Sequence, residues 1–102
     1  MVVHCGESIP TVYAEYDVVD YGDNLIIPGF VDTHAHAPQY CNRGLGMDKE
    51  LLPWLETYTF PEEAKFSDLD YARLVYGAFV HDLWRNGTTR SILFGTIHKD
   101  ST

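Results

Sequence analysis

The chain has 102 residues and carries Lys+Arg 7 against Asp+Glu 15, so its formal net charge is −8. This acidic balance argues against a nucleic-acid or anionic-membrane partner, because either would favour a basic face, and no apolar run approaches the roughly 20 residues of a membrane span. The hydrophobic fraction of 45% and the aromatic fraction of 14% argue against wholesale disorder, and the length indicates one domain at most.

The amino-terminal residues 1–25 show no clear helical or strand period, and residues 21–24 have the composition of a turn. Residues 1–10 contain no Lys or Arg and are not typical of a signal peptide. Cys5 and Cys41 fit neither a disulfide framework nor a C-x-x-C site. We therefore expect a cytoplasmic protein whose two thiols are reduced and buried as small side chains.

A short apolar run after a Pro-Gly break predicts a strand at Phe30–Thr33. The following residues 37–66 are rich in Pro and Gly, which indicates a long loop with one short helix, Lys49–Tyr58, whose leucines lie at helical spacing. Glu62 and Glu63, near the end of this loop, are expected to form a solvated surface pair.

The clearest element of the sequence is a helix at Asp68–Arg85, because apolar residues recur along it at i, i+3, i+4 and i+7. Either Ser67 or Asp68 can cap its amino end. His81 falls opposite the apolar stripe and is expected to be solvated. The β-prone segment Thr88–Phe94 is predicted as the next strand. Strand, loop, helix, turn and strand together predict a βαβ unit, which implies a parallel sheet.

The main chemical signal is the pair His34 and His36, directly after the first predicted strand. Side chains two residues apart on a strand point to the same face, so Phe30 and Asp32 are expected on the face of both histidines. Two imidazoles one pleat apart can bind one transition-metal ion through their nitrogens, and the carboxyl ends of strands carry the chemistry of α/β folds. Asp32 is placed to orient a ligand histidine. The alternative is two polar histidines that share a loop by chance.

Residues 28–36, Pro-Gly-Phe-Val-Asp-Thr-His-Ala-His, resemble the first barrel strand of the amidohydrolase superfamily, the metal-dependent hydrolases built on a (β/α)₈ barrel. Further segments resemble the branch of that superfamily that deaminates guanine; they are 34–40, 52–61, 86–89 and 96–98. The resemblance covers about residues 20–102. It implies an α/β fold in which 26–102 form the first βαβ unit of an incomplete TIM-type barrel, preceded at 1–25 by the remnant of a small β-domain.

The resemblance implies a role for five residues. His34 and His36 would be the first two ligands of a zinc ion, although imidazole also suits iron. Gln39 would face the bound purine, because its amide has both a donor and an acceptor; an ordinary exposed loop amide is the alternative. Trp54 would form the loop wall over the substrate or pack as helix core. His98 would lie at the barrel mouth, where a rim histidine making a structural hydrogen bond is the favoured interpretation.

The activity that the resemblance implies is hydrolytic deamination of guanine to xanthine and ammonia, in which zinc lowers the pKa of a bound water. The remaining ligands and the proton-transferring group of such enzymes come from later strands, and none can be placed in this chain. A barrel takes about 250 residues, so we expect a fragment without activity of its own. The alternatives are an amidohydrolase acting on another amino-heterocycle and an inert truncated product. The expected partner is a small purine base, with a homodimeric parent protein left open.

Overall fold

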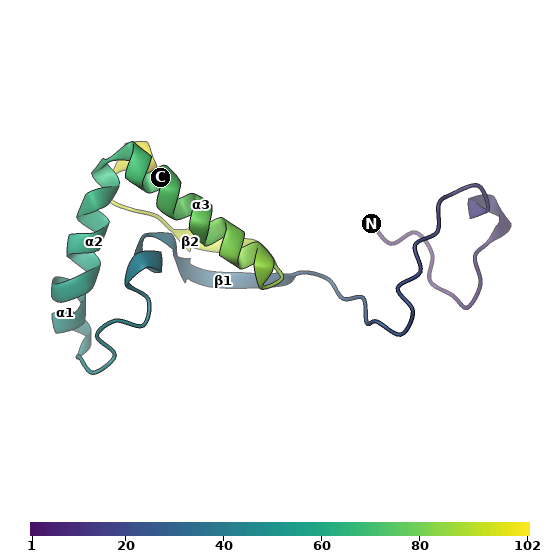
Figure 1. Cartoon of the computed structure of the whole chain (residues 1–102), viewed down its shortest axis with the longest axis horizontal. Coiled ribbons are helices and arrows are strands. Elements are labelled where there is room, and N and C mark those ends of the chain that lie inside the picture. The colour runs from purple at the N-terminus through teal and green to yellow at the C-terminus, as the bar shows by residue number, and fades with distance from the viewer.

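The computed structural model describes residues 1–102, and its regular structure lies mainly between Phe30 and Ser101 (Figure 1). Two strands and three α-helices follow one another along the chain: β1 (Phe30–His36), α1 (Leu51–Trp54), α2 (Phe60–Ala64), α3 (Leu69–Arg85) and β2 (Thr88–Phe94). None of the helices has the length and apolar character that a membrane span requires.

Strands β1 and β2 form a two-stranded parallel sheet, and α3 connects them, which confirms the predicted βαβ unit. β2 has the predicted bounds, whereas β1 continues three residues beyond the predicted Thr33 and includes both histidines. The pairing register shifts by one residue between Phe30 and Val31 and shifts back between Asp32 and Ala35. Such irregularities redirect side chains locally, so strict alternation does not hold along the whole of β1.

Helix α3 begins and ends as its sequence predicts. The carboxylate of Asp68 accepts hydrogen bonds from the backbone N–H groups of Asp70 (2.9 Å) and Tyr71 (3.3 Å), so Asp68 is the N-cap. After the helix, Gly87 has φ +81°, a backbone conformation that residues other than glycine rarely adopt. The buried residues of the helix are those of the apolar stripe, Ala72, Val75 and Phe79, and His81 on the other side is exposed as predicted.

The predicted short helix Lys49–Tyr58 is wrong in its extent, because helical structure runs without a break from Leu51 to Ser67. A π-helical turn, Leu55–Thr59, joins α1 to α2, and Phe60 donates its backbone N–H to the carbonyl of Leu55, five residues back. Pro61 follows this turn in the first turn of α2. Proline has no N–H and its ring would clash with the carbonyl four residues earlier in a regular α-helix, so the wider turn lets the helix continue through it.

The core is small and aromatic. Phe66 is completely buried, beside Ala72 and Val75 of α3, and partly buried tyrosines pack against these three residues. The ring of Phe66 lies edge-on to Tyr71 at 5.3 Å between centroids, and 5.1 Å from Tyr76. Only nine of the 102 residues are buried. The large apolar side chains of the strands are exposed, among them Phe30, Val31 and Ile92, whereas Phe66 is enclosed by its helical neighbours.

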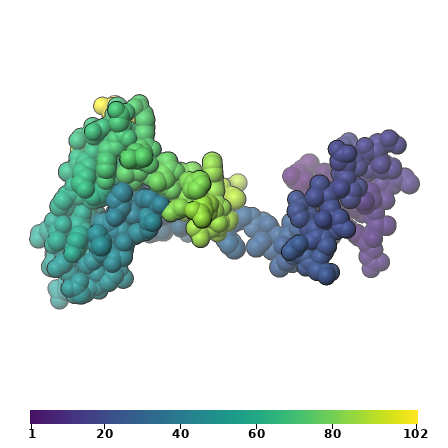
Figure 2. All heavy atoms as spheres, in the orientation of Figure 1, coloured from purple at the N-terminus to yellow at the C-terminus, as the bar shows by residue number.

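The amino-terminal residues 1–29 extend away from the βαβ unit, as Figures 1 and 2 show. Their one regular element is a 3₁₀ turn, Thr11–Tyr13, and they contain no strand. The assignment of 1–25 to a β-domain therefore stays a prediction. The expectation of buried thiols is wrong, because Cys5 and Cys41 are both exposed. Cys5 lies on the extended segment, where no other element covers it.

Candidate functional site

The two histidines of the motif lie together at the carboxyl end of β1. Their Nε2 atoms are 3.2 Å apart and their ring centroids 5.1 Å apart, so both rings project from the same face of the strand. Two imidazole nitrogens that bind one tetrahedral zinc at about 2.0–2.1 Å would be about 3.3 Å apart. The spacing of His34 and His36 therefore suits two ligands of a single metal ion. No third His, Cys, Asp or Glu joins them in this chain.

Phe94, the last residue of β2, was not among the predicted site residues. It pairs in register with His36, its ring stacks on His36 with a centroid distance of 4.6 Å and an interplanar angle of 12°, and it lies 5.0 Å from the ring of His34. Phe94 thus restricts the orientation of both imidazoles. The sequence signal was available, because Phe94 ends the predicted second strand, but the register that brings it to His36 comes from the tertiary structure.

Asp32 acts on the backbone of the motif in this structure. Its Oδ1 accepts a hydrogen bond of 3.0 Å from the backbone N–H of His34. This contact lies beside the register shift between Asp32 and Ala35, where one residue of β1 has no direct partner on β2. The carboxylate therefore stabilises the irregular backbone that presents His34, and it makes no hydrogen bond to an imidazole.

Gln39 and Trp54 lie on the segments that follow β1. Gln39 is half-buried in a 3₁₀ segment, Ala37–Asn42, which begins directly after His36. Trp54 is half-buried at the end of α1, and its indole N–H donates to the carbonyl of Leu45 at 2.8 Å. A side chain at Gly46 would collide with the ring of Trp54, because a Cβ there would lie 2.8 Å from its Cδ1. Trp54 thus closes the loop that follows Gln39.

His98 lies in the turn after β2. Its backbone carbonyl accepts hydrogen bonds from Ser101 N–H (3.0 Å) and from the hydroxyl of Thr102 (3.1 Å). The Nε2 atom of its imidazole is buried and has no hydrogen-bond partner. The structural hydrogen bonds at this position are therefore made by the backbone, whereas the role of the imidazole stays a prediction.

Glu62 is buried, so the prediction of a solvated Glu62–Glu63 pair is wrong for this residue. Its carboxylate accepts hydrogen bonds from Lys65 Nζ (2.6 Å) and from the hydroxyl of Tyr71. Burial raises the pKa of Glu62, but the hydrogen bonds from Lys65 and Tyr71 outweigh it and the net shift is downward. Burial and the neighbouring Glu62 carboxylate raise the pKa of Tyr71 well above its usual range.

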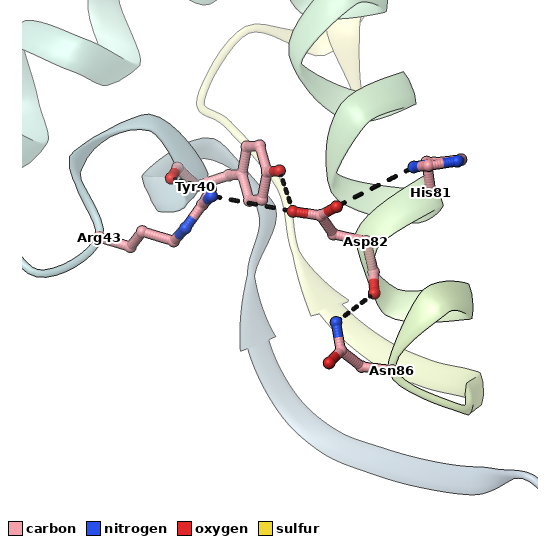
Figure 3. A network of polar contacts seen from close by, with 5 residues as sticks. All are labelled: Tyr40, Arg43, His81, Asp82 and Asn86. Carbon is pink, nitrogen blue, oxygen red and sulfur yellow. Dashed lines mark hydrogen bonds and ion pairs between the residues drawn. The ribbon is translucent and has the colours of Figure 1, made fainter.

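A second polar network joins the Gln39 region to α3 (Figure 3). The hydroxyl of Tyr40 donates to Oδ2 of Asp82, and Arg43 Nη2 lies 3.8 Å from the same oxygen. The hydrogen bond to Asp82 raises the pKa of Tyr40, and the hydrogen bond from Tyr40 together with the charge of Arg43 lowers the pKa of Asp82. Near neutral pH Tyr40 is therefore a neutral donor and Asp82 an anionic acceptor.

Comparisons with known proteins match most of this chain to guanine deaminases. A guanine deaminase of Dictyostelium discoideum is 54% identical over 85 residues, which are 83% of this chain and 19% of that protein. A guanine deaminase of Escherichia coli is 49% identical over 84 residues, again 19% of its length. The crystal structure of a guanine deaminase from C. acetobutylicum with bound guanine superimposes with a TM-score of 0.89 and 59% identity, covering 93% of this chain and 23% of that chain.

The chain thus spans about a fifth of the length of the curated relatives it matches. Its two parallel strands and connecting helix form a small part of the TIM-barrel-type fold that the family and the solved structure imply. The model of the Amidohydrolase family matches residues 25–100, about three quarters of the sequence. The chain belongs to the amidohydrolase family.

Proposed function

We propose that this chain is the amino-terminal part of a zinc-dependent guanine deaminase. The observation that carries the proposal is the pair of imidazole nitrogens 3.2 Å apart at the end of β1, in a chain about half identical to proteins named guanine deaminase. In this assignment residues 26–102 open the barrel, and residues 1–25 belong to a small β-domain. The reaction consumes guanine and water and yields xanthine and ammonia, in a cytoplasmic enzyme.

His34 and His36 would hold the zinc ion through Nε2. When bound, zinc supplies an activated water near neutral pH. The contribution of the chain is orientation: Phe94 stacks on His36, and Asp32 fixes the backbone of His34, so the two nitrogens are held at ligand spacing before the metal arrives. Such preorganisation favours metal binding, because fewer rotamers are lost when the ion binds.

Gln39 would recognise the base. The edge of guanine carries a carbonyl oxygen and a ring N–H, and a glutamine amide offers a donor for the first and an acceptor for the second. Gln39 is only three residues from His36 and half-buried, so its amide would act close to the metal. An amidohydrolase that acts on another amino-heterocycle is the second candidate; in that enzyme, replacing Gln39 would have little effect on the choice of base.

The test is to purify the full-length protein, measure its metal content, and follow loss of guanine together with release of ammonia. We expect His34→Asn and His36→Asn each to abolish metal retention and deamination. His4→Asn is the matched control, because His4 is an exposed histidine of the extended segment, and it should leave both unchanged. Deamination of a different ring with guanine left intact would contradict the substrate assignment, and stoichiometric zinc in the His34→Asn protein would contradict the metal assignment.

A further inference from the structure

The four residues that follow Gln39, residues 40–43, all have side-chain contacts with helical residues. We propose that Asp82 of α3, through Tyr40 and Arg43, is a positioning residue that fixes the segment 37–43, called here the Gln39 segment, and so sets the place of Gln39 relative to the metal-binding histidines. This inference rests on the proposed function, because it assigns Asp82 a part in the recognition of guanine.

The contacts close a ring of three residues (Figure 3). The hydroxyl of Tyr40 donates a hydrogen bond to Asp82 Oδ2, and the guanidinium of Arg43 lies 3.8 Å from that oxygen. Arg43 also donates through Nη1 to the backbone carbonyl of Tyr40 at 3.0 Å, and its Cζ lies 3.9 Å from the centroid of the Tyr40 ring. One carboxylate thus binds two side chains of the Gln39 segment, which in turn bind each other.

Further contacts join the Gln39 segment to the same group of helices. The ring of Tyr40 packs edge-on against Phe79 of α3 at 5.7 Å. Cys41 Sγ lies 3.7 Å from the hydroxyl of Tyr71, which donates to the buried Glu62. Asn42 donates to the hydroxyl of Thr59 at 3.4 Å. Because each contact comes from the helices, the helices define the position of the segment.

Gln39 is one peptide unit from this anchored region. Consecutive Cα atoms are 3.8 Å apart across a planar trans peptide, so the position of Tyr40 limits where the backbone of Gln39 can lie. Misplacement of a substrate-positioning group by about 1 Å can cost on the order of a hundredfold in kcat/KM. Loosening Asp82 is therefore expected to affect the binding of guanine while the histidine pair, held separately by Phe94 and Asp32, keeps its geometry.

The same helix offers a matched control. Asp70 of α3 also pairs with an arginine, Arg73, at 2.9 Å, but both residues lie in the same helix and the Asp70 side chain is 93% exposed. The side chain of Asp82 is 38% exposed. An Asp→Ala change at either position removes a carboxylate with an arginine partner from α3. Only the change at Asp82 removes a contact to the Gln39 segment.

The experiment compares Asp82→Ala, Tyr40→Phe, the double variant and Asp70→Ala in the metal-loaded full-length enzyme. We expect KM for guanine to rise about tenfold in Asp82→Ala and by a similar factor in Tyr40→Phe, with kcat changed less than KM. The double variant should be no worse than the Asp82 variant, since both remove the same contact. Asp70→Ala should leave KM and kcat as in the wild type.

A measurement that needs no substrate separates this inference from the proposed function. Amide hydrogen exchange in residues 37–43 should accelerate in Asp82→Ala and stay unchanged in Asp70→Ala. Faster exchange in Asp82→Ala with an unchanged KM would overturn the positioning role. Equal losses of kcat and metal content in Asp82→Ala with an unchanged KM would also overturn it, because they would indicate a purely structural residue. A wild-type enzyme that leaves guanine intact would overturn the proposed function, while the exchange result would still test the contact itself.

Discussion

The isolated 102-residue chain should not unfold cooperatively when it is heated. Its accessible surface is 8589 Å², whereas a compact protein of its mass, 11.6 kDa, exposes about 5,800 Å². Its radius of gyration is 20.5 Å, against about 13 Å for a compact domain of the same length. The structure therefore leaves on the order of 2,700 Å² exposed that an autonomous domain would bury.

The free energy at stake can be worked from this area. If roughly 57% of the excess surface is apolar, as is typical of protein surfaces, about 1,500 Å² of apolar surface is involved. At about 25 cal/mol per Å² this corresponds to roughly 40 kcal/mol of hydrophobic stabilisation that the isolated chain does not gain. The net stability of a domain is only about 5–15 kcal/mol. The shortfall is large enough to decide the outcome even if the area-based figure is high by a factor of two.

The assay is circular dichroism of the isolated chain during heating, followed by scanning calorimetry. We expect a broad, sloping loss of helical signal without an enthalpy peak, whereas the full-length protein should show a sharp transition. A compact domain of this length typically has an unfolding enthalpy of about 70 kcal/mol. A sigmoidal melt of the isolated chain with an enthalpy of that size would refute the reasoning from exposed area.

Three further predictions concern the stability of the full-length protein. Phe66→Ala should lower the free energy of unfolding by about 3–5 kcal/mol in urea titrations, because Phe66 is fully buried. Phe66→Leu leaves a smaller cavity and should lower it less. Equal losses of unfolding free energy in the two variants would contradict this prediction. Asp68→Ala should cost about 1 kcal/mol through loss of the cap of α3, while Asp68→Asn, which keeps the acceptor, should cost less. Stability should decrease as the pH falls below about 4.5, because the pKa of Glu62 is lowered in the folded state: its contribution is complete above its unfolded pKa and is lost as the pH falls through its folded pKa. Glu62→Gln should flatten that part of the pH dependence, and an unchanged profile would exclude Glu62 as its source.

Local signals predicted the βαβ unit well. The period of the apolar residues and the Asp68 cap define α3 within one residue, because both act within the helix itself. The strand Thr88–Phe94 is predicted with its observed bounds. The exact pairing of β1 with β2, including its two shifts, depends on contacts between distant parts of the chain, and no local pattern specifies it.

The candidate site was predicted in part. The spacing of His34 and His36 led to the prediction that their side chains share a face, and the 3.2 Å between their nitrogens confirms it. Phe94 and Asp82 were missed, because the first acts through strand register and the second through a contact 42 residues distant in sequence. The burial of Glu62 was missed for a related reason: a carboxylate in a charged pair indicates solvent unless its partners, here Lys65 and Tyr71, are known.

The π-helical turn between α1 and α2 has a consequence for the direction of every side chain after it. An α-helix advances about 100° per residue, and a turn closed over five residues in place of four inserts one residue into that count. The turn Leu55–Thr59 therefore rotates the angular phase of α2 by about 100° relative to a continuous α-helix. This rotation helps to direct Glu62 towards Tyr71 and the Gln39 segment. Deleting one residue from the turn would restore the α-helical count and direct the Glu62 carboxylate to a different side of the helix. The number of residues between Trp54 and Phe60 therefore sets the direction of the side chains of α2 as well as the distance that the chain spans.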